Sequence, residues 1–219
     1  MKVSEIFLSI EGEGKRVGTP CVFIRLYGCN LRCSYCDSLY AIEGKDYQEL
    51  SINQIVDELK KYNVKNITLT GGEPLIHKDV DDLINKLISE KFFINIETNG
   101  TIKPIIKGEN IFYTVDWKSP SSMMMDRMNL SVFKNLSKND VIKFVVGNIE
   151  DLLQAESVIQ RLQELYNDEI PSIFISPIFN QIDNESIVNF ILHSETLKKQ
   201  TRFQIQLHKI IWNPEMRGV

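Results

Sequence analysis

The sequence has few cysteines, no long apolar run and no excess of basic residues. Its four cysteines all lie within the first 36 of 219 residues. A disulfide framework would spread its bridges through a small secreted fold, so this clustering indicates metal ligation instead. No apolar run is long enough to span a bilayer. The formal net charge of −4 argues against a general nucleic-acid or membrane-surface binder.

The remaining bulk properties are those of an ordinary globular protein. Hydrophobic residues make up 43% and charged residues 25% of the chain, which is typical of soluble domains. Glu5 and Glu11 interrupt the apolar N-terminal stretch, so it lacks the pattern of a cleavable signal peptide. We therefore expect a cytoplasmic protein with a single domain over residues 1–219.

Apolar, β-rich runs alternate with amphipathic helical patterns. Strands are expected at residues 21–26, 67–69, 92–96, 111–115, 141–146, 173–175 and 203–207. Apolar residues recur at helical spacing in 52–59, 80–88, 149–162 and 187–192, and Ser51 with Gln54 has the spacing of a capping box. Alternating strands and helices predict an α/β fold with a mostly parallel sheet. Too few units are present to close an eight-fold barrel, so we expect a partial, open (β/α)6-type TIM barrel with active residues at the C-terminal strand ends.

Cys29, Cys33 and Cys36 form a C-x3-C-x2-C motif. Three thiolates on one loop can hold three irons of a [4Fe–4S] cluster and leave the fourth iron open. An open iron can bind the amino and carboxylate groups of S-adenosylmethionine (SAM), whose sulfonium one electron can then cleave. Structural zinc normally takes four ligands, and Cys21 lies inside an expected strand, where a buried free cysteine is common. The spacing favours the cluster, with zinc or structural thiols as the alternatives.

A second motif makes the sequence resemble the radical SAM superfamily. The segment Thr70–Pro74 reads TGGEP and is similar to the GGE motif that follows the second main strand in that superfamily. The resemblance implies that Gly72 lets the backbone approach SAM and that Glu73 accepts from the SAM α-ammonium. It also implies that Tyr35 lies near the adenine.

Further segments, in order along the whole chain, resemble one family, the 7-carboxy-7-deazaguanine synthases. They cover residues 6–14, 23–31, 36–38, 97–101, 116–122, 143–146 and 206–219. The resemblance implies conversion of 6-carboxy-5,6,7,8-tetrahydropterin into 7-carboxy-7-deazaguanine by a radical ring contraction with loss of ammonia. A 5′-deoxyadenosyl radical would take hydrogen from C6 of the pterin and later recover it, so that SAM is regenerated. The product would serve 7-deazapurine biosynthesis, including the queuosine modification of tRNA.

The resemblance also implies the residues of the site. Those in catalysis would be Arg25, Glu13, Thr70 and His208, and those that contact the substrate would be Ile10, Glu11, Gly12, Arg25, Thr70 and the carboxylate of Val219. Those that contact SAM would be Tyr35, Asp37, Gly72, Glu73, Asp116, Lys118, Ser176 and Phe179. Ser38 would bind Mg²⁺, because a hydroxyl oxygen is a hard ligand. A helix cap is the alternative role of Ser38.

Several of these residues have plainer alternative roles. The planar fork of Arg25 suits the substrate carboxylate, but it could instead form a salt bridge at the edge of the core. Glu13 could be a solvated turn residue, and Lys118 a charge at a strand end. Glu11 departs from the glutamine more usual in the family, and a carboxylate accepts hydrogen bonds but cannot donate them.

The implied partners are a small-molecule pterin, a second copy of the chain in a homodimer, and a flavodoxin or ferredoxin as reductant. Direct binding to nucleic acid or to a membrane is not expected. Two other functions stay open from the residues alone. A glycyl-radical-enzyme activase would share the cysteine motif and the short barrel, and a non-catalytic Fe–S or zinc protein would share the cysteines.

Overall fold

The computed structural model describes residues 1–166 and 170–219, and its strands form a nine-stranded sheet in the order β3-β1-β2-β4-β5-β6-β7-β8-β9. The strands are β1 (Lys2–Ile10), β2 (Pro20–Leu26), β3 (Gln48–Glu49), β4 (Asn66–Gly71), β5 (Phe93–Thr98), β6 (Ile111–Trp117), β7 (Val141–Val146), β8 (Ser172–Pro177) and β9 (Thr201–Phe203). The helices are α1 (Ile52–Lys61), α2 (Val80–Ser89), α3 (Leu130–Phe133), α4 (Ile149–Tyr166), α5 (Asn184–His193) and α6 (Leu207–Ile211).

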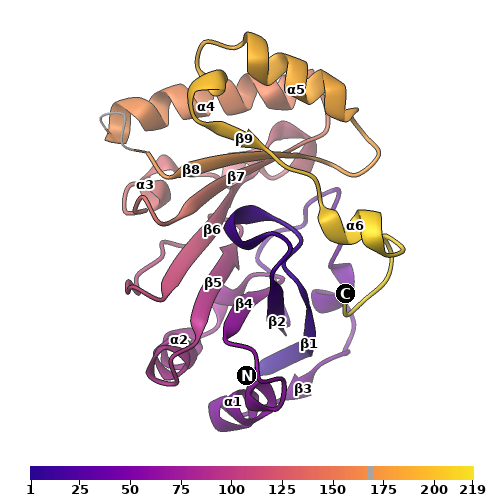
Figure 1. Ribbon diagram of the computed structural model, residues 1–219, viewed down its shortest axis with the longest axis vertical. Coiled ribbons are helices and arrows are strands. Elements are labelled where there is room, and N and C mark those ends of the chain that lie inside the picture. Colours follow the sequence, from indigo (N-terminus) through magenta and orange to yellow (C-terminus); the bar gives the residue numbers. More distant parts are fainter. Residues whose placement is uncertain (167–169) are drawn as a thin grey trace.

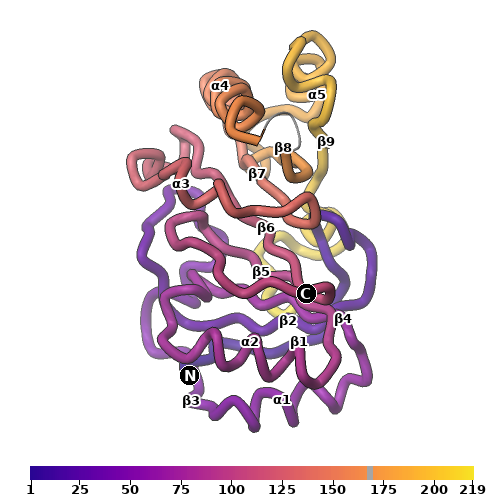
Figure 2. The backbone as a smooth tube through the Cα atoms, turned by 90° about the vertical axis from the view of Figure 1, so that its left-hand side faces the viewer, coloured from indigo at the N-terminus to yellow at the C-terminus, as the bar shows by residue number. Residues whose placement is uncertain are grey.

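The sheet is an open, partial barrel, as the sequence predicts. Pairing is parallel from β2 through β9, whereas β1 pairs antiparallel with both β2 and β3. Strands β1 and β9 are not hydrogen-bonded neighbours, so the barrel does not close. Helices α1 and α2 lie at one end of the curved sheet and α4 and α5 at the other (Figures 1 and 2).

Most expected elements are confirmed, and one strand is placed differently. The capping box of Ser51 and Gln54 is present at the start of α1. The last strand was expected at 203–207, but β9 is Thr201–Phe203 and Leu207 begins α6. The backbone N–H of Leu207 donates to Gly12 O at 3.0 Å. This bond draws the chain away from the sheet toward the loop after β1.

Alternation along the strands separates an apolar outer face from a polar inner face. Outward-facing side chains such as Leu69, Ile96 and Ile142 are fully buried, and each contributes roughly 1.5–3 kcal/mol of hydrophobic stabilisation. The register places Arg25 beside Thr70, and Asp116 beside Lys143. Because neighbouring parallel residues in register point to the same face, these polar side chains line the barrel interior.

The loop after β1 bridges the gap between the two ends of the sheet. The backbone N–H of Gly14 donates to Gln204 Oε1 at 2.7 Å, beside the bond from Leu207 to Gly12. The chain beyond α6 folds back, so that the Arg217 guanidinium lies 3.8 Å from the Tyr40 ring centroid. In the described residues, no helix combines the length and the apolar composition that crossing a bilayer requires.

Candidate active site at the C-terminal mouth of the barrel

Three cysteines lie on the loop that follows β2. Cys29, Cys33 and Cys36 are half-buried, whereas Cys21 is fully buried within β2, with its thiol 3.3 Å from Thr68 Oγ1. Burial raises the pKa of Cys33 and of Cys36, and the nearby Lys118 ammonium acts in the opposite direction on both. Three thiols but no fourth are therefore available on this loop, which suits a cluster with one open iron better than four-ligand zinc.

The cluster loop is held from two sides. Ser34 N donates to Ser122 O at 3.1 Å, which joins the loop to the segment after β6. Asn99 Nδ2 lies 3.6 Å from Cys29 Sγ and 2.9 Å from Asn30 Oδ1. Within the described part of the chain, no three cysteine, histidine or acidic side chains converge as a ready-made metal site. The loop thus presents its thiols on one braced segment without closing them around a metal.

Gly72 packs directly against the start of the cluster loop. A Cβ atom at this position would lie 2.2 Å from Gly28 O and 2.8 Å from Cys29 Cβ. Glu73 N donates to Gly28 O at 2.8 Å, so the two segments are also bonded. Only a residue without a side chain allows this approach.

We expect Gly72→Ala to displace the cluster loop. The added methyl group would destabilise the protein by about 1–3 kcal/mol through overpacking and would lower the iron bound after anaerobic reconstitution. Iron analysis and urea unfolding measure the two effects. Gly108→Ala is the matched control, because its added Cβ would meet one methyl group of Ile111 at 3.3 Å and would not contact the cluster loop. Unchanged iron content in the Gly72 variant would contradict this role of the close approach.

Glu73 is fully buried, and the protein itself satisfies its carboxylate. Its oxygens accept from Leu75 N at 3.0 Å, Thr98 Oγ1 at 2.7 Å and Asn99 N at 2.6 Å. Burial raises the pKa of Glu73 to about 7. This placement favours an indirect role, in which Glu73 holds the turn after β5 and Asn99 holds the cluster loop, over the expected direct contact with SAM.

Lys118, one of the residues expected on the SAM side, pairs with a second one, Asp116. Its ammonium is 2.7 Å from Asp116 Oδ2, and although burial opposes it, Asp116 raises the pKa of Lys118. The hydroxyls of Tyr35 and Ser176 are buried and have no hydrogen-bond partner among the described residues. An unsatisfied buried hydroxyl costs about 1–3 kcal/mol. A bound polar molecule such as SAM would satisfy both groups.

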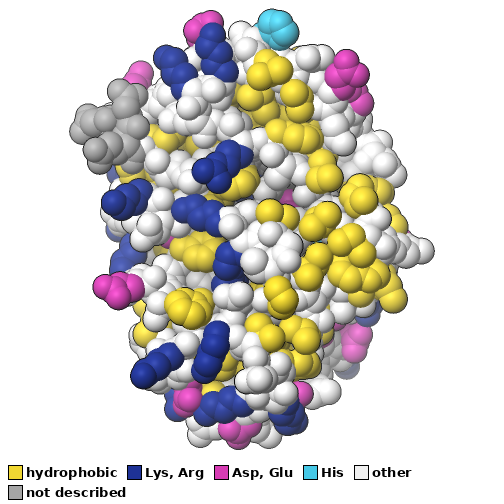
Figure 3. Space-filling view, viewed as in Figure 1, with side chains coloured by type: hydrophobic (Ala, Val, Ile, Leu, Met, Phe, Trp, Pro, Cys, Tyr) yellow, Lys and Arg dark blue, Asp and Glu magenta, His cyan; other side chains and the backbone are white. Residues whose placement is uncertain are grey.

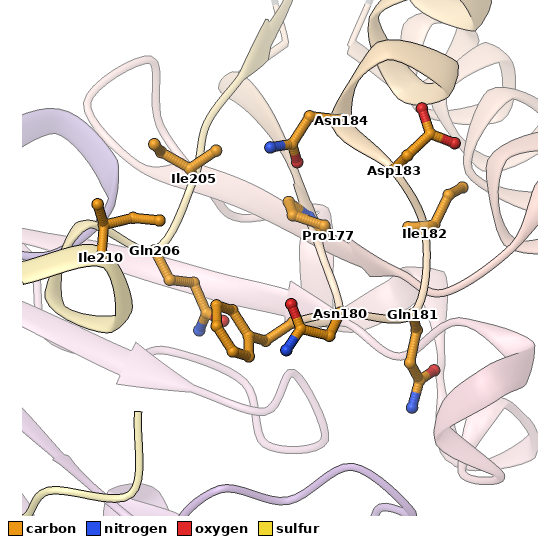
Figure 4. Close-up of a pocket in the computed structure, with 10 residues that line it drawn as sticks. Pro177, Asn180, Gln181, Ile182, Asp183, Asn184, Ile205, Gln206 and Ile210 are labelled. Carbon is orange, nitrogen blue, oxygen red and sulfur yellow. The ribbon is translucent and has the colours of Figure 1, made fainter. Parts of the chain in front are cut away.

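Phe179 lines a pocket of about 460 Å³ between the loop after β8 and the segment at Ile205 to Ile210 (Figure 4). The Lys209 ammonium is 5.6 Å from the Phe179 ring centroid and 3.4 Å from Asp37 Oδ2. The C-terminal segment thereby joins two residues of the expected SAM set, Asp37 and Phe179.

Arg25 forms the salt bridge that was one of the two roles expected for it. Its Nε donates to Glu5 Oε1 at 2.7 Å, so the salt bridge is present. Its NH1 is 3.4 Å from Ser38 Oγ, and the Ser38 hydroxyl donates to Asp37 Oδ1 at 3.2 Å. The ion pair therefore fixes one edge of the guanidinium, and the other edge is turned toward the cluster loop.

A buried ionic cluster lines the interior beside Arg25. Lys143 Nζ lies 3.3 Å from Glu13 Oε2 and 3.3 Å from Asp116 Oδ1. Thr70 Oγ1 donates to Glu97 Oε2 at 3.2 Å. Burial raises the pKa of Glu97 to about 7, while the Lys143 charge acts to lower it. The structure thus joins Glu13, Thr70 and Asp116, which the sequence singled out, through Glu97 and Lys143.

Glu97, Lys143 and Gln204 were not assigned roles from the sequence. Gln204 Nε2 donates to Glu13 Oε1 at 3.3 Å, so it orients that carboxylate. A signal was available for Lys143, because a lysine inside the apolar run VIKFVV needs a buried counter-charge. Nothing local to Gln204 indicates its partner.

Glu11 does not reach the mouth with its side chain. Its carboxylate is 2% exposed and accepts from Arg16 NH2 at 3.1 Å and from Thr68 Oγ1 at 2.5 Å. The Glu11 side chain is therefore not placed for the substrate contact expected of it, and its backbone N–H and C=O are bonded to Thr19 O and Gly18 N.

Of the two C-terminal residues of the expected site, His208 lies against the loop after β1. A Cβ on Gly12 would be 2.1 Å from His208 Nδ1, so the imidazole packs against the loop, and burial lowers the pKa of His208. Val219 is half-buried. The preceding Arg217 stacks on Tyr40, whose hydroxyl donates to the Glu5 partner of Arg25.

Comparison with known proteins agrees with this geometry. The Radical SAM superfamily matches residues 23–129. The chain is 43% identical to the 7-carboxy-7-deazaguanine synthase of Clostridium acetobutylicum over 100% of its own length and 99% of the relative. It is 40% identical to that of Methanospirillum hungatei, over 98% of this chain and 86% of the relative.

Two solved structures share the fold. QueE from Escherichia coli superposes with a TM-score of 0.76 at 23% identity, over 94% of each chain. Streptococcus suis SuiB, solved with S-adenosylmethionine, gives a TM-score of 0.52 at 16% identity over 84% of this chain and 46% of that one. The sequence matches favour neither a glycyl-radical activase nor a non-catalytic Fe–S or zinc protein. With the three-cysteine loop, the glycine at its base and full-length identity to named synthases, this chain belongs to the 7-carboxy-7-deazaguanine synthase family of the radical SAM superfamily.

Proposed function

We propose that this protein converts 6-carboxy-5,6,7,8-tetrahydropterin into 7-carboxy-7-deazaguanine, with loss of ammonia, in 7-deazapurine and queuosine biosynthesis. The observation that carries the proposal is the polar interior beside the cysteine loop. There Glu13, Glu97 and Thr70 offer acceptors to an amino-pterin, and NH1 of Arg25 faces Ser38 beside the cysteine loop. Full-length identity to named synthases supports the same reaction.

The proposed cofactors fit the residues present. Cys29, Cys33 and Cys36 would hold a [4Fe–4S] cluster, and SAM would lie against Gly72 and the orphaned hydroxyls of Tyr35 and Ser176. Together the cluster and SAM would supply the radical that starts the reaction. The proposed SAM contacts also include Asp37, Asp116, Lys118 and Phe179. Glu73 would act indirectly, because it holds Asn99, which contacts the cluster loop.

The chain's own residues bind and orient the substrate. The Arg25 guanidinium would pair with the pterin carboxylate, since Glu5 already fixes its other edge. Glu13 and Glu97 would accept from the pterin's amino and ring N–H groups. Thr70, on β4, would face the pterin ring. His208 and the Val219 carboxylate, both on the C-terminal segment, would complete the substrate contacts and help to exclude water.

The proposal is tested by product formation. Anaerobically reconstituted protein is incubated with the carboxytetrahydropterin, SAM, Mg²⁺ and a chemical or flavodoxin reductant, and the products are separated by chromatography and identified by mass. We expect 7-carboxy-7-deazaguanine and ammonia, with SAM not consumed in proportion to product. Cleavage of SAM with no deazaguanine formed would overturn the proposal.

We propose Mg²⁺ as a third cofactor, with Ser38 as its protein ligand. Ser38 Oγ lies beside the Asp37 carboxylate, so two hard oxygen groups adjoin at this point. We expect Ser38→Ala to weaken the stimulation of turnover by Mg²⁺ while its iron content stays that of the wild type. Ser34→Ala is a control on the same loop. An unchanged response of the Ser38 variant to Mg²⁺ would remove Ser38 as a ligand.

We further propose that the protein is a cytoplasmic homodimer in which residues 1–219 of each chain form a single catalytic domain. A flavodoxin or ferredoxin would supply the electrons. Exposed apolar side chains gather over α6 (Figure 3), where Ile210 is 63% and Ile211 50% exposed. Met123 is 77% exposed in the loop that contacts the cluster segment. Light scattering tests the dimer, and Ile210→Lys is expected to favour the monomer if α6 forms the interface.

A further inference from the structure

A buried ammonium group connects the two halves of the site. Lys143 projects from β7 into the barrel, and its side chain is 9% exposed. Its Nζ atom lies at 3.3 Å from both Glu13 Oε2 and Asp116 Oδ1. Glu13 comes from the loop after β1, and Asp116 lies opposite Lys143 on the neighbouring strand β6, so one cation joins the N-terminal loop to the middle of the sheet.

The contacts of Asp116 extend this connection toward the cluster loop. One of its oxygens faces Lys143 and the other faces Lys118, which lies 2.7 Å away. A row of alternating charges thus runs from Lys118 through Asp116 and Lys143 to Glu13 on the substrate side.

We propose that Lys143 is a positioning residue, which holds the Glu13 carboxylate in place for the amino-pterin, ties it to Asp116 on the SAM side and places its positive charge near Glu97. The inference rests on the proposed function for the identity of the ligand. Two carboxylates that face one small interior repel each other, and an isolated buried charge is costly. The Lys143 ammonium, 3.3 Å from Glu13 and near enough to Glu97 for its charge to act there, offsets both effects.

Removal of Lys143 is expected to raise the pKa of Glu97. This carboxyl faces Thr70 on β4, Asp116 on β6, Lys143 on β7, and Glu11 and Glu13 from the loop after β1. Burial raises its pKa to about 7, the neighbouring acids raise it further, and Lys143 acts against them. Without Lys143 the pKa rises, so Glu97 takes up a proton at higher pH and ceases to be a pure acceptor.

The test compares Lys143→Met with Lys107→Met in reconstituted protein. Lys107 pairs with the buried Asp140 at 3.4 Å, away from the barrel mouth, and so controls for the loss of an ion pair to a buried carboxylate. Two quantities are measured across neutral pH: the dissociation constant of the carboxytetrahydropterin, and the infrared band of protonated carboxyls without any ligand. Thermal melting reports on folding.

We expect Lys143→Met to weaken pterin binding about 100-fold, to shift the acid limb of binding to higher pH, and to keep a carboxyl protonated to higher pH. Lys143→Arg, which retains the charge, should recover part of the affinity, and it provides the comparison if the methionine variant does not fold. Wild-type affinity and an unshifted carboxyl band in Lys143→Met would overturn the inference. Absence of pterin binding to the wild type would instead overturn the proposed function, and the infrared band would still test the role of Lys143.

Discussion

Replacing Cys33 with alanine should leave a folded protein that assembles no [4Fe–4S] cluster. The loop carries three thiols and the fourth cysteine is enclosed in β2, so no other thiol can replace the lost ligand. We expect bound iron to fall from about four per chain to well below one, and SAM cleavage to vanish with it. Iron and sulfide analysis, the EPR spectrum of the reduced protein and formation of 5′-deoxyadenosine measure these losses.

Cys21→Ala is the control for this prediction. Cys21 lies 3.3 Å from Thr68 Oγ1 in the barrel interior, and burial raises the pKa of its thiol to about 12. A thiol that stays protonated is a poor metal ligand, so iron content should match the wild type. A cluster that survives Cys33→Ala but not Cys21→Ala would reverse the ligand assignment.

Replacing Arg16 with methionine should lower the free energy of unfolding by about 3–5 kcal/mol, because it leaves the buried Glu11 carboxylate without its counter-charge. Glu11 is 2% exposed and Arg16 14%, and their side chains meet at 3.1 Å. The guanidinium also donates to Ile67 O and Phe93 O, each at 2.9 Å. The pair therefore fixes the loop after β1 against β4 and β5.

The double variant Arg16→Met with Glu11→Gln is the informative comparison. With both charges removed, the amide can still accept from Thr68, which lies beside Glu11, so most of the lost stability should return. Urea unfolding of the four proteins gives the coupling energy. Lys61→Met breaks an exposed pair with Glu58 and should change stability by less than about 0.5 kcal/mol. A double variant no more stable than Arg16→Met alone would contradict the pairing.

This pair also accounts for the glutamate at position 11, a departure from the family motif. In the sequence, Glu11 stands where glutamine is usual, and the residues alone suggest an altered pterin contact. In the structure the carboxylate faces Arg16 at the floor of the barrel and not the substrate side. The substitution is therefore explained by a local counter-charge five residues away.

Prediction from sequence succeeded where structure is set by local pattern. The apolar run at 141–146 coincides with β7, and the capping box at Ser51 begins α1 as expected. It failed at β9, where a bond from Leu207 to Gly12 O ends the strand early. That bond joins segments at the two ends of the chain, so no local pattern could indicate it.

The sequence by itself determined the cysteine loop, because eight consecutive residues place three thiols on one short segment whatever surrounds them. It also determined the family, through fragments spread along the whole chain. Only the tertiary structure decided which polar groups share the barrel interior. Lys143 meets Glu13 across 130 residues of chain, and Gln204 meets it across 191. Such contacts depend on strand order and register, which bring distant side chains to one face and bury their charges together.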